Sequence, residues 1–271
     1  MFLAECHTHT KYSPDAKHSV ADMAKAAYDA GATYICFTDH VDDCAVNDPV
    51  TYYVAPFAGW DERAADIARV QEEYAGRMEI RIGAEVGSGS HMPDVAERIY
   101  NDRGLDFVIG SLHSLRDEDD FYRIEYTSLD QCLDLTEKYF REMTELAETG
   151  LCDVLGHIGL PKRYMKQQGF SFDVMLFEDY IREIYSVIIP KGIGIELNTS
   201  GMRDILQQPI PQFEAIKLYR EMGGEIITVG SDSHTPDVVC AGIRDGYELM
   251  REAGFEYVTV FREHKPFFEK I

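Results

Sequence analysis

Short runs of apolar, often β-branched residues recur along the chain and alternate with longer segments whose apolar positions follow a helical period. We expect eight strands, at residues 2–6, 33–38, 79–84, 106–110, 152–156, 193–197, 225–229 and 257–261. Strands that alternate with helices in this way are typical of βα units built around a parallel sheet. The pattern therefore predicts an α/β fold.

The segments between the strands carry the signals of helices. Ser19, followed by Asp22, has the pattern of a capping box, and Gly31 provides a stop. The apolar residues between 129 and 147 recur with a period near 3.6, so one face of that helix must pack against the sheet. No Pro/Gly/Ser-rich linker or block of charge divides the chain, and we expect a single domain over residues 1–271.

Residue types that bind metals follow most of these strands at the point where each strand ends. Read in order, the strand ends are Cys6-His7-Thr8-His9, Thr38-Asp39-His40, Ala84-Glu85, Leu112-His113, Gly156-His157, Leu197-Asn198 and Ser231-Asp232-Ser233-His234. The carboxyl ends of parallel strands converge on one face of a closed barrel, whereas an open sheet spreads them along a line. The convergence of so many ligands favours a closed barrel with its site at that face.

Nine residues are candidate metal ligands: His7, His9, Asp15, His40, Glu85, His113, His157, Asp232 and His234. A His-x-His at a strand end directs both imidazoles to the same side, because strand side chains alternate. Nine ligands exceed one tetrahedral site and indicate two or three ions, with Glu85 as a candidate bridge. Mixed imidazole and carboxylate ligands suit Zn, Mn or Fe better than Ca or Mg.

Composition and charge narrow the function classes. The chain has 271 residues, 45% of them hydrophobic, and 26 Lys and Arg against 48 Asp and Glu give a net charge of −22. This excess of carboxylates repels phosphate backbones and anionic membranes, so we expect neither as a partner. No basic start or long apolar window is present, and six scattered cysteines form no C-x-x-C pair, which is typical of a cytoplasmic protein with reduced thiols.

The charge of the site indicates a substrate class. Three divalent ions among three carboxylates keep a charge of about +3 before any hydroxide binds, which attracts an anion such as phosphate. A hydroxide held between two ions can attack phosphorus while the ions stabilise the entering and leaving oxygens. The sequence therefore predicts a metal-dependent phosphoesterase.

These motifs together resemble the PHP superfamily, the polymerase-and-histidinol-phosphatase domains. The resemblance rests on HTHT at 7–10, TDH at 38–40, Glu85, GSLH at 110–113, GH at 156–157 and SDSH at 231–234. The size of the chain, the NTSGMR segment at 198–203 and Ser13-Pro14-Asp15 are similar to histidinol-phosphate phosphatases of the monofunctional PHP type. The resemblance implies a phosphomonoesterase that converts L-histidinol phosphate to L-histidinol and phosphate in histidine biosynthesis.

The same resemblance implies a fold and an arrangement of ligands. It implies a distorted (β/α)7 barrel with three divalent ions at the C-terminal ends of the strands. Position by position, it assigns His7, His9, Glu85 and Asp232 to the first ion, Glu85, His113 and His157 to the second, and Asp15, His40 and His234 to the third. Since a seven-stranded barrel leaves one apolar run over, residues 257–261 are either an additional strand or a C-terminal tail.

Arginines and a proton donor complete the expected site. Arg163 and Arg203, which follow strand ends, are the candidates for binding the substrate phosphate, ahead of Arg116 and Arg123. The leaving alkoxide takes its proton from Asp39, from His234 or from a metal-bound water. Asp39 also has a second interpretation, because its neighbour His40 faces the other way in a strand and Asp39 can then orient an imidazole.

The glycine-rich segment Gly87-Ser88-Gly89-Ser90 also allows two interpretations. Its backbone N–H groups can cradle a phosphate, or the segment can form a flexible loop at the rim of the site. The G-x-G-x-x-G spacing of a dinucleotide site is absent.

Three other functions compete with this prediction. The first is a PHP-type nuclease or nucleotide phosphatase that acts on a nucleoside 3′- or 5′-phosphate, which the acidic charge disfavours. The second is an amidohydrolase, which needs a bridging lysine on a middle strand that this chain lacks. The third is a non-catalytic metal-binding module, which would have gaps in its ligand set. We expect the partner to be a small phosphorylated metabolite and the chain to act as a monomer or small homo-oligomer.

Overall fold

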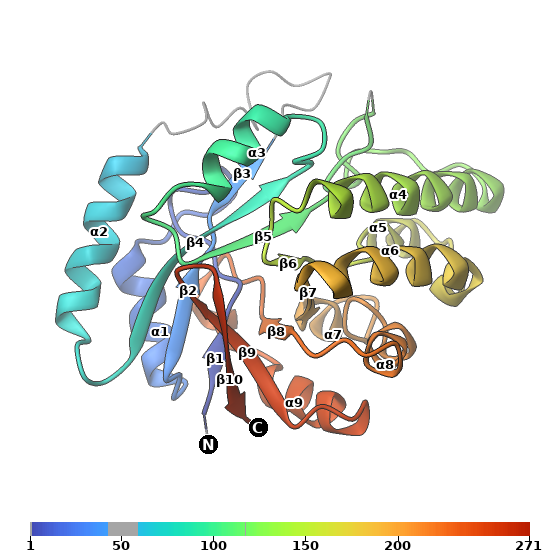
Figure 1. The fold of residues 1–271 in the computed structure, drawn as a ribbon. Helices are drawn as coiled ribbons and strands as arrows, with labels where there is room; N and C mark the ends of the chain where they lie inside the picture. The colour runs from blue at the N-terminus through green and yellow to red at the C-terminus, as the bar shows by residue number, and fades with distance from the viewer. Residues whose placement is uncertain (1, 43–58, 117) are drawn as a thin grey trace.

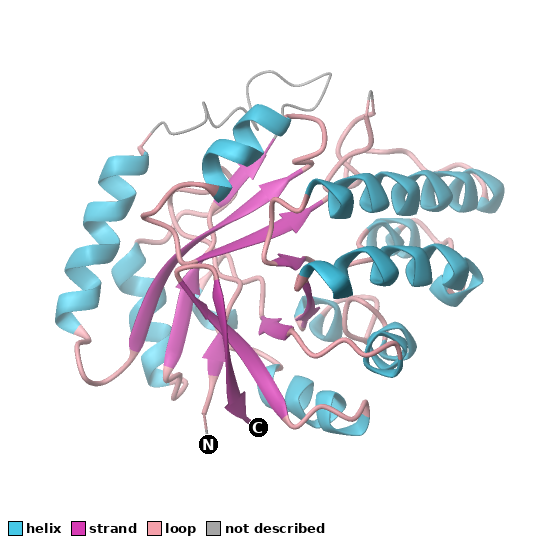
Figure 2. Ribbon diagram, in the orientation of Figure 1, coloured by secondary structure: helices cyan, strands magenta, loops and turns pink. Residues whose placement is uncertain are grey.

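Parallel strands arranged around a barrel form the centre of the molecule, and helices cover its outer face (Figures 1 and 2). The structure is a computed structural model that describes residues 2–42, 59–116 and 118–271. The strands are β1 (Ala4–Glu5), β2 (Tyr34–Phe37), β3 (His40–Asp42), β4 (Glu79–Gly87), β5 (Phe107–Ser111), β6 (Val154–Leu155), β7 (Gly194–Asn198) and β8 (Ile227–Gly230). Their order is β1-β2-β4-β5-β6-β7-β8, and every pair is parallel.

Strand β3 continues the path of β2 and pairs with the second half of β4, where His40 lies opposite Glu85. The first and last strands of the order meet through backbone hydrogen bonds. The Cys6 N–H donates to the Val229 carbonyl at 3.0 Å, and the Asp232 N–H donates to the His7 carbonyl at 2.9 Å. These contacts close the sheet, so the predicted parallel barrel is confirmed.

Nine α-helices connect or flank the strands in the described part of the chain. They are α1 (Val20–Asp29), α2 (Trp60–Glu73), α3 (Pro93–Tyr100), α4 (Leu129–Thr149), α5 (Pro161–Gln167), α6 (Glu178–Lys191), α7 (Ser200–Arg203), α8 (Phe213–Glu221) and α9 (Ile243–Glu252). Two short 3₁₀ helices are η1 (Val174–Phe177) and η2 (Pro236–Val238). The predicted capping box is present at α1, where Ser19 and Asp22 exchange hydrogen bonds. Helix α4 buries one face, as its period predicts.

The apolar run at 257–261 belongs to a hairpin outside the barrel. Strands β9 (Tyr257–Arg262) and β10 (Lys265–Lys270) pair only with each other, in antiparallel register. Phe261 stacks on Phe107 with ring centroids 5.0 Å apart, and its carbonyl accepts a hydrogen bond of 2.8 Å from the Tyr34 hydroxyl. Because Tyr34 and Phe107 begin their strands, the hairpin covers the N-terminal end of the barrel, and seven strands build its wall.

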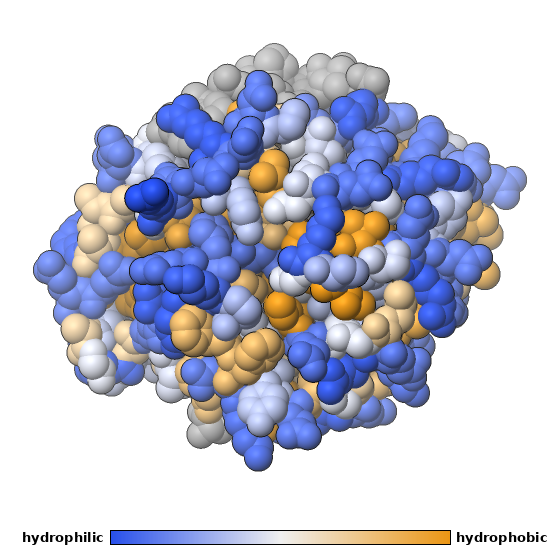
Figure 3. All heavy atoms as spheres, viewed as in Figure 1, coloured by the Kyte–Doolittle hydropathy of each residue, from blue (hydrophilic) through white to orange (hydrophobic). Residues whose placement is uncertain are grey.

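One face of the molecule is mostly hydrophilic and the described cysteines are free thiols, as the composition and the cysteine spacing predict. The face in Figure 3 is mostly hydrophilic, with smaller hydrophobic areas between the polar side chains. Of the cysteines in the described residues, Cys6, Cys36, Cys132 and Cys152 are buried, Cys240 is partly exposed, and all five are free; Cys44 lies outside the described residues. None of the described helices has the length and hydropathy needed to cross a bilayer.

Candidate metal centre

The nine predicted ligands lie together at the C-terminal ends of the barrel strands. Ligand atoms of four sets lie within 4.8 Å of one another: His7, His9 and Glu85; Glu85, His113 and His157; His9, His40 and His234; and His40, Asp42 and His113. Asp232 and Asp15 contact members of these sets through their carboxylates. Side chains from the C-terminal parts of strands, or from the residues just after them, thus share one continuous site, because barrel closure brings those strand ends to a common rim.

The first group is built from the loop after β1 together with β4 and the end of β8. The Glu85 Oε2 atom lies 3.2 Å from His7 Nε2 and 3.6 Å from His9 Nε2. Asp232 Oδ1 lies 3.8 Å and 3.4 Å from the same two nitrogens. Two imidazoles therefore face two carboxylates, which is the grouping that the resemblance implied for the first ion.

Glu85 also belongs to the second group, through its other oxygen. Its Oε1 atom lies 2.8 Å from His157 Nε2 and 3.2 Å from His113 Nε2, and those two nitrogens are 3.4 Å apart. Glu85 thus faces the first group with one oxygen and the second with the other. This is the geometry of a bridging carboxylate between closely spaced cations.

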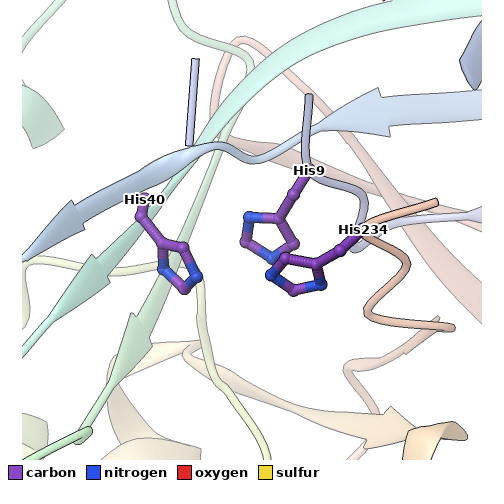
Figure 4. A group of neighbouring side chains, drawn as sticks. All are labelled: His9, His40 and His234. Carbon is purple, nitrogen blue, oxygen red and sulfur yellow. The ribbon is translucent and has the colours of Figure 1, made fainter. Parts of the chain in front are cut away.

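The third group lies nearer the rim of the site. The ring of His9 stacks on those of His234 and His40, with centroids 4.1 Å and 4.2 Å apart (Figure 4). Asp15 Oδ2 lies 3.1 Å from His234 Nε2 and 3.7 Å from His40 Nε2. The carboxylate that the sequence placed after the first motif therefore reaches the two histidines from distant strands.

Several atoms that face the centre of the site have no hydrogen-bond partner among the described residues. They are His7 Nε2, His9 Nε2, His40 Nδ1, Glu85 Oε2 and His234 Nε2. A buried polar atom without a partner is costly, and most such atoms in folded proteins are satisfied. Imidazole nitrogens and carboxylate oxygens directed at a common centre are the donors that divalent metal ions require. The residues therefore fit bound metal ions.

The protonation states of Glu85 and His9 suit the same role. Neighbouring carboxylates, however, raise the pKa values of His7, His40 and His113 despite their burial, so these histidines must lose a proton when a metal binds. Burial by itself raises the pKa of Glu85, but the neighbouring His7, His113 and His40 hold it well below its usual range. Burial and the charges of His234 and His40 lower the pKa of His9 to about 3. A neutral imidazole offers a nitrogen lone pair and an ionised carboxylate offers its oxygens, so both groups are in the form that binds a metal.

Other polar side chains hold the imidazoles from behind. Glu196 Oε1 lies 2.6 Å from His7 Nδ1, and Asp42 Oδ2 lies 3.0 Å from His113 Nδ1. Such contacts fix the ring orientation and the tautomer of a ligating histidine. The sequence analysis missed both carboxylates, although Asp42 stands two residues after His40 and the alternation that linked His7 to His9 would have indicated it.

Asp39 lies behind the ligands and does not line the pocket. Its carboxylate accepts hydrogen bonds from the backbone and hydroxyl of Thr10, from the Ser13 hydroxyl and from Arg63 Nε, the last at 2.6 Å. Ser13 Oγ in turn lies 3.0 Å from His9 Nδ1 and accepts a hydrogen bond from the His40 N–H. Burial raises the pKa of Asp39, and Arg63 more than reverses this, so the carboxyl is ionised. This placement favours the orienting interpretation of Asp39 over a proton donor.

The two predicted phosphate-binding arginines differ in position. Arg163, on α5, lines the pocket, where its Nε atom lies 2.5 Å from Asp204 Oδ2 and its guanidinium contacts the Ser200 hydroxyl. Arg203, at the end of α7, donates to the Asp232 carbonyl at 3.3 Å but is not among the pocket-lining residues. The second-choice Arg116 pairs with Glu145 on the outside of the molecule.

The glycine-rich segment is packed rather than free. Gly87 is the last residue of β4, and Ser88 is buried, with its N–H donating to the Ser111 carbonyl at 2.7 Å. A Cβ atom on Gly87 would collide with the Asp42 carboxylate and lie 2.6 Å from His113 Nδ1. Gly87 therefore leaves room for the contact between Asp42 and His113. The expectation of a flexible rim loop is wrong at these two residues.

A cleft of about 360 Å³ opens directly above the ligands. The metal-type side chains form its floor, and Arg163 forms part of its side. The rest of its wall is made of residues that the sequence analysis did not identify, namely Asp120, Tyr122, Leu160 and Tyr164. These residues come from the segment after β5 and from the start of α5, which carry no metal-type motif of their own.

A closed parallel barrel with this ring of ligands at the carboxyl ends of its strands defines a metal-binding barrel protein. The chain belongs to the PHP domain family, whose model matches residues 5–200. It is 30% identical to a probable histidinol-phosphatase of Deinococcus radiodurans over 97% of this chain and 98% of that protein. It is also 25% identical to a histidinol-phosphatase of Lactococcus lactis, over 94% and 93% of the two chains.

The fold has a solved counterpart. The crystal structure of histidinol phosphate phosphatase from Lactococcus lactis, complexed with Zn, L-histidinol and phosphate, matches with a TM-score of 0.81 and 22% identity. The match covers 98% of both chains. It establishes the same barrel architecture for this chain.

Proposed function

We propose that this chain is a histidinol-phosphatase, which hydrolyses L-histidinol phosphate to L-histidinol and phosphate in histidine biosynthesis. The observation that carries the proposal is the continuous ring of nine ligands at the floor of a cleft whose side holds Arg163. The full-length similarity to proteins named histidinol-phosphatase supports the choice of substrate.

The ligand groups provide places for three divalent ions of the Zn, Mn or Fe type. His7, His9, Glu85 and Asp232 would hold the first, Glu85, His113 and His157 the second, and Asp15, His40 and His234 the third. When bound, such ions lower the pKa of a coordinated water toward neutrality and stabilise negative charge on phosphoryl oxygens. The floor of the cleft is then positive within an acidic protein.

The residues of the chain orient the reacting groups. Arg163 presents its guanidinium to the cleft, because Asp204 and Ser200 hold it in place, and it binds the non-bridging oxygens of the phosphate. Glu196 and Asp42 keep His7 and His113 turned toward the floor of the cleft. Rigid supports of this kind hold the substrate in the reactive geometry, which accounts for a large part of a catalysed rate.

The proton for the leaving alkoxide comes from the open side of the cleft. His234 lines the cleft, whereas Asp39 is buried behind the ligands and paired with Arg63. A proton donor must reach the leaving oxygen directly or through one water. Because His234 is assigned to the third ion, we place this step at a water beside His234, and we assign Asp39 the task of orienting Ser13 and, through it, His9.

The test is phosphate release from a panel of esters by the purified, metal-loaded protein. The panel contains L-histidinol phosphate, a nucleoside 5′-phosphate, a nucleoside 3′-phosphate and p-nitrophenyl phosphate, and the metal content is measured on the same sample. We expect kcat/KM for L-histidinol phosphate to exceed the others by about 100-fold or more, because a built site rejects esters that lack its polar contacts. Preference for a nucleotide would instead favour the PHP-type nucleotide phosphatase, and equal turnover of all four esters would refute the assignment of substrate.

A further inference from the structure

A buried carboxylate lies between β1 and the end of β8, where the barrel closes, and the chemistry proposed above does not use it. Glu5 is the last residue of β1, two residues before His7, and it is fully buried. A carboxylate is costly to remove from water unless hydrogen bonds compensate it. The donors around Glu5 therefore indicate what this side chain holds in place.

Both oxygens of Glu5 accept hydrogen bonds from the segment after β8. Oε1 accepts one of 2.8 Å from the Ser231 N–H. Oε2 accepts from the Ser231 hydroxyl and, at 2.9 Å, from the Cys240 N–H. Oε1 also accepts from the His7 N–H at 3.2 Å. One carboxylate thus joins both ends of residues 231–240, here called the ligand loop, to the segment that carries His7.

Two residues of the ligand loop have a strained backbone. Asp232 has a φ of 53° and Cys240 a φ of 61°, in the left-handed region that residues other than glycine rarely adopt. Such conformations persist only where the surrounding contacts hold them. The Cys240 N–H donates to Glu5 directly, and Asp232 follows Ser231, which donates twice. Glu5 is therefore bonded at or beside both strained positions.

The ligand loop supplies a side chain to two of the three ligand groups. Asp232 Oδ1 lies 3.4 Å from His9 Nε2 in the first group. His234, which Figure 4 shows beside His9, has its Nε2 atom 3.1 Å from Asp15 Oδ2 in the third. The second group consists of residues outside the loop. A displaced ligand loop would thus disturb the first and third groups and spare the second.

We infer that Glu5 is a positioning residue, which holds both ends of the ligand loop so that Asp232 and His234 face the bound ions. The inference rests on the proposed function, which places ions at these groups. Glu5 acts through the backbone on either side of the two ligands, because its oxygens are engaged by the N–H and hydroxyl groups of the loop. Supports behind metal ligands contribute about 10- to 100-fold to metal affinity.

The first measurement is the Zn²⁺ affinity of the metal-free protein, titrated in competition with a chromophoric chelator. In Glu5→Gln an NH₂ group replaces one acceptor oxygen and faces an N–H group. We expect two of the binding steps to weaken by about 10- to 100-fold, while the step at the second group keeps its wild-type constant. Phosphate release should fall at limiting Zn²⁺ and recover at saturating Zn²⁺.

The second measurement needs no metal. Hydrogen exchange of the metal-free proteins, followed by mass spectrometry, reports how well the N–H groups of the ligand loop are protected. Peptides from this loop should exchange about tenfold faster in Glu5→Gln than in the wild type, as the loss of a hydrogen bond to a charged group implies. Peptides from α4 should exchange at the wild-type rate in both proteins.

Asp153→Asn is the matched control, because Asp153 is a buried carboxylate at the other end of the barrel, where it accepts a hydrogen bond of 2.8 Å from the Val108 N–H. It should keep every Zn²⁺ binding step and the protection of the ligand loop. Ser231→Ala is the milder variant in case Glu5→Gln does not fold. It removes only the hydroxyl donor and should weaken the same two steps by about three- to tenfold.

Three results would overturn the inference: wild-type Zn²⁺ affinities in Glu5→Gln, wild-type protection of its ligand loop, or the same loss of affinity in Asp153→Asn. The two proposals can also fail separately. If a nucleotide is a far better substrate than L-histidinol phosphate, the proposed function is refuted. The Zn²⁺ titration and the hydrogen exchange use no substrate, so they still decide whether Glu5 positions the ligand loop.

Discussion

At the scale of single residues, the support behind the ligands depends on one buried arginine. Arg63 is 1% exposed and reaches from α2 into the barrel wall, where it donates to Asp39 Oδ2 and to the carbonyls of Phe37 and Gly83, the last two at 2.7 Å. Asp39 in turn orients Ser13. Arg63 thus neutralises a buried carboxylate that was itself a candidate for catalysis.

Arg63→Met tests this support. We expect the variant to lose about 3–5 kcal/mol of unfolding free energy, because it leaves the Asp39 charge buried without a partner. Urea denaturation of the metal-free protein measures the loss. Arg69→Met on the same helix is the control, since the exposed Arg69 pairs with Asp66 at the surface and its loss should change stability little. Equal effects of the two substitutions would contradict the role of Arg63.

Gly87→Ala probes the crowded contact between the supporting carboxylate and its histidine. The added methyl group would displace Asp42 or His113, so we expect less metal in the site and at least about a tenfold loss of kcat. Metal content per chain and phosphate release measure the effect. Gly89→Ala is the matched control, because its Cβ would approach a Val86 methyl group no closer than 3.3 Å. If Gly87→Ala kept full metal content and activity, the contact between Asp42 and His113 would have no role in metal binding.

At the scale of elements, the hairpin β9–β10 has a structural task separate from catalysis. It covers the end of the barrel opposite the cleft, and its turn residue His264 contacts Asp153 Oδ2 through Nδ1 at 2.9 Å. The Glu263 N–H also donates to Asp106 Oδ1 at 3.1 Å. The carboxylates of two segments that precede barrel strands thus hold the turn.

His264 makes the attachment of this hairpin dependent on pH. The hydrogen bond to Asp153 raises the pKa of His264, despite the opposing effect of burial. A folded-state pKa above the unfolded value contributes stability in full below about pH 6.5, and this stability is lost as the pH rises through the folded pKa. We expect His264→Asn, which tolerates the positive φ of 58° at this turn, to remove that part of the pH dependence.

Urea midpoints of the two proteins at about pH 6 and about pH 9 check this prediction, since their difference isolates His264 from other titrating groups. The gap between wild type and variant should be largest at the lower pH. Turnover should stay unchanged, because His264 is far from the cleft at the other end of the barrel. A gap that grows toward high pH would contradict the assigned sign.

At the scale of the whole molecule, the ligands link the barrel strands across its top. They lie on β3 and β4 or in the segments after β1, β5, β6 and β8, so ions bound at the floor would tie together segments from both ends of the chain. In the unfolded chain these ligands are far apart, and a metal that binds only the folded state stabilises it. Metal binding should therefore be visible in stability as well as in activity.

Removal of metal tests this linkage. We expect a chelator to abolish phosphate release and to lower the free energy of unfolding by about 4 kcal/mol, the value for an ion present at about 1,000 times its Kd. Thermal unfolding with and without chelator measures it. Asp232→Ala removes a ligand of the first group, so this variant should lose most activity. The chelator should also lower its free energy of unfolding by less than it does for the wild type. If the chelator lowered the free energy of unfolding of Asp232→Ala as much as that of the wild type, the role of Asp232 as a metal ligand would be contradicted.

The sequence by itself determined the alternation of strands and helices and the identity of the metal-type residues. Both are local properties: strand side chains alternate with a period of two, and His7, Glu85 and Asp232 each stand at or near the end of an apolar run. The tertiary structure alone decided which carboxylates support these ligands. Glu196 and Asp42 act through contacts with His7 and His113, which lie 189 and 71 positions away in the chain. Local alternation places Asp42 on the same side as His40, but it does not indicate which histidine this carboxylate supports.

The hairpin at the end of the chain illustrates the same division. The apolar run at 257–261 predicts a strand, and β9 is one. Whether that strand joins the barrel or covers its base depends on which partner it hydrogen-bonds, and a run of buried apolar residues reads the same in either place. Only the pairing with β10 and the packing of Phe261 on Phe107 decide it, because seven strands already close the barrel and an eighth has no edge to join.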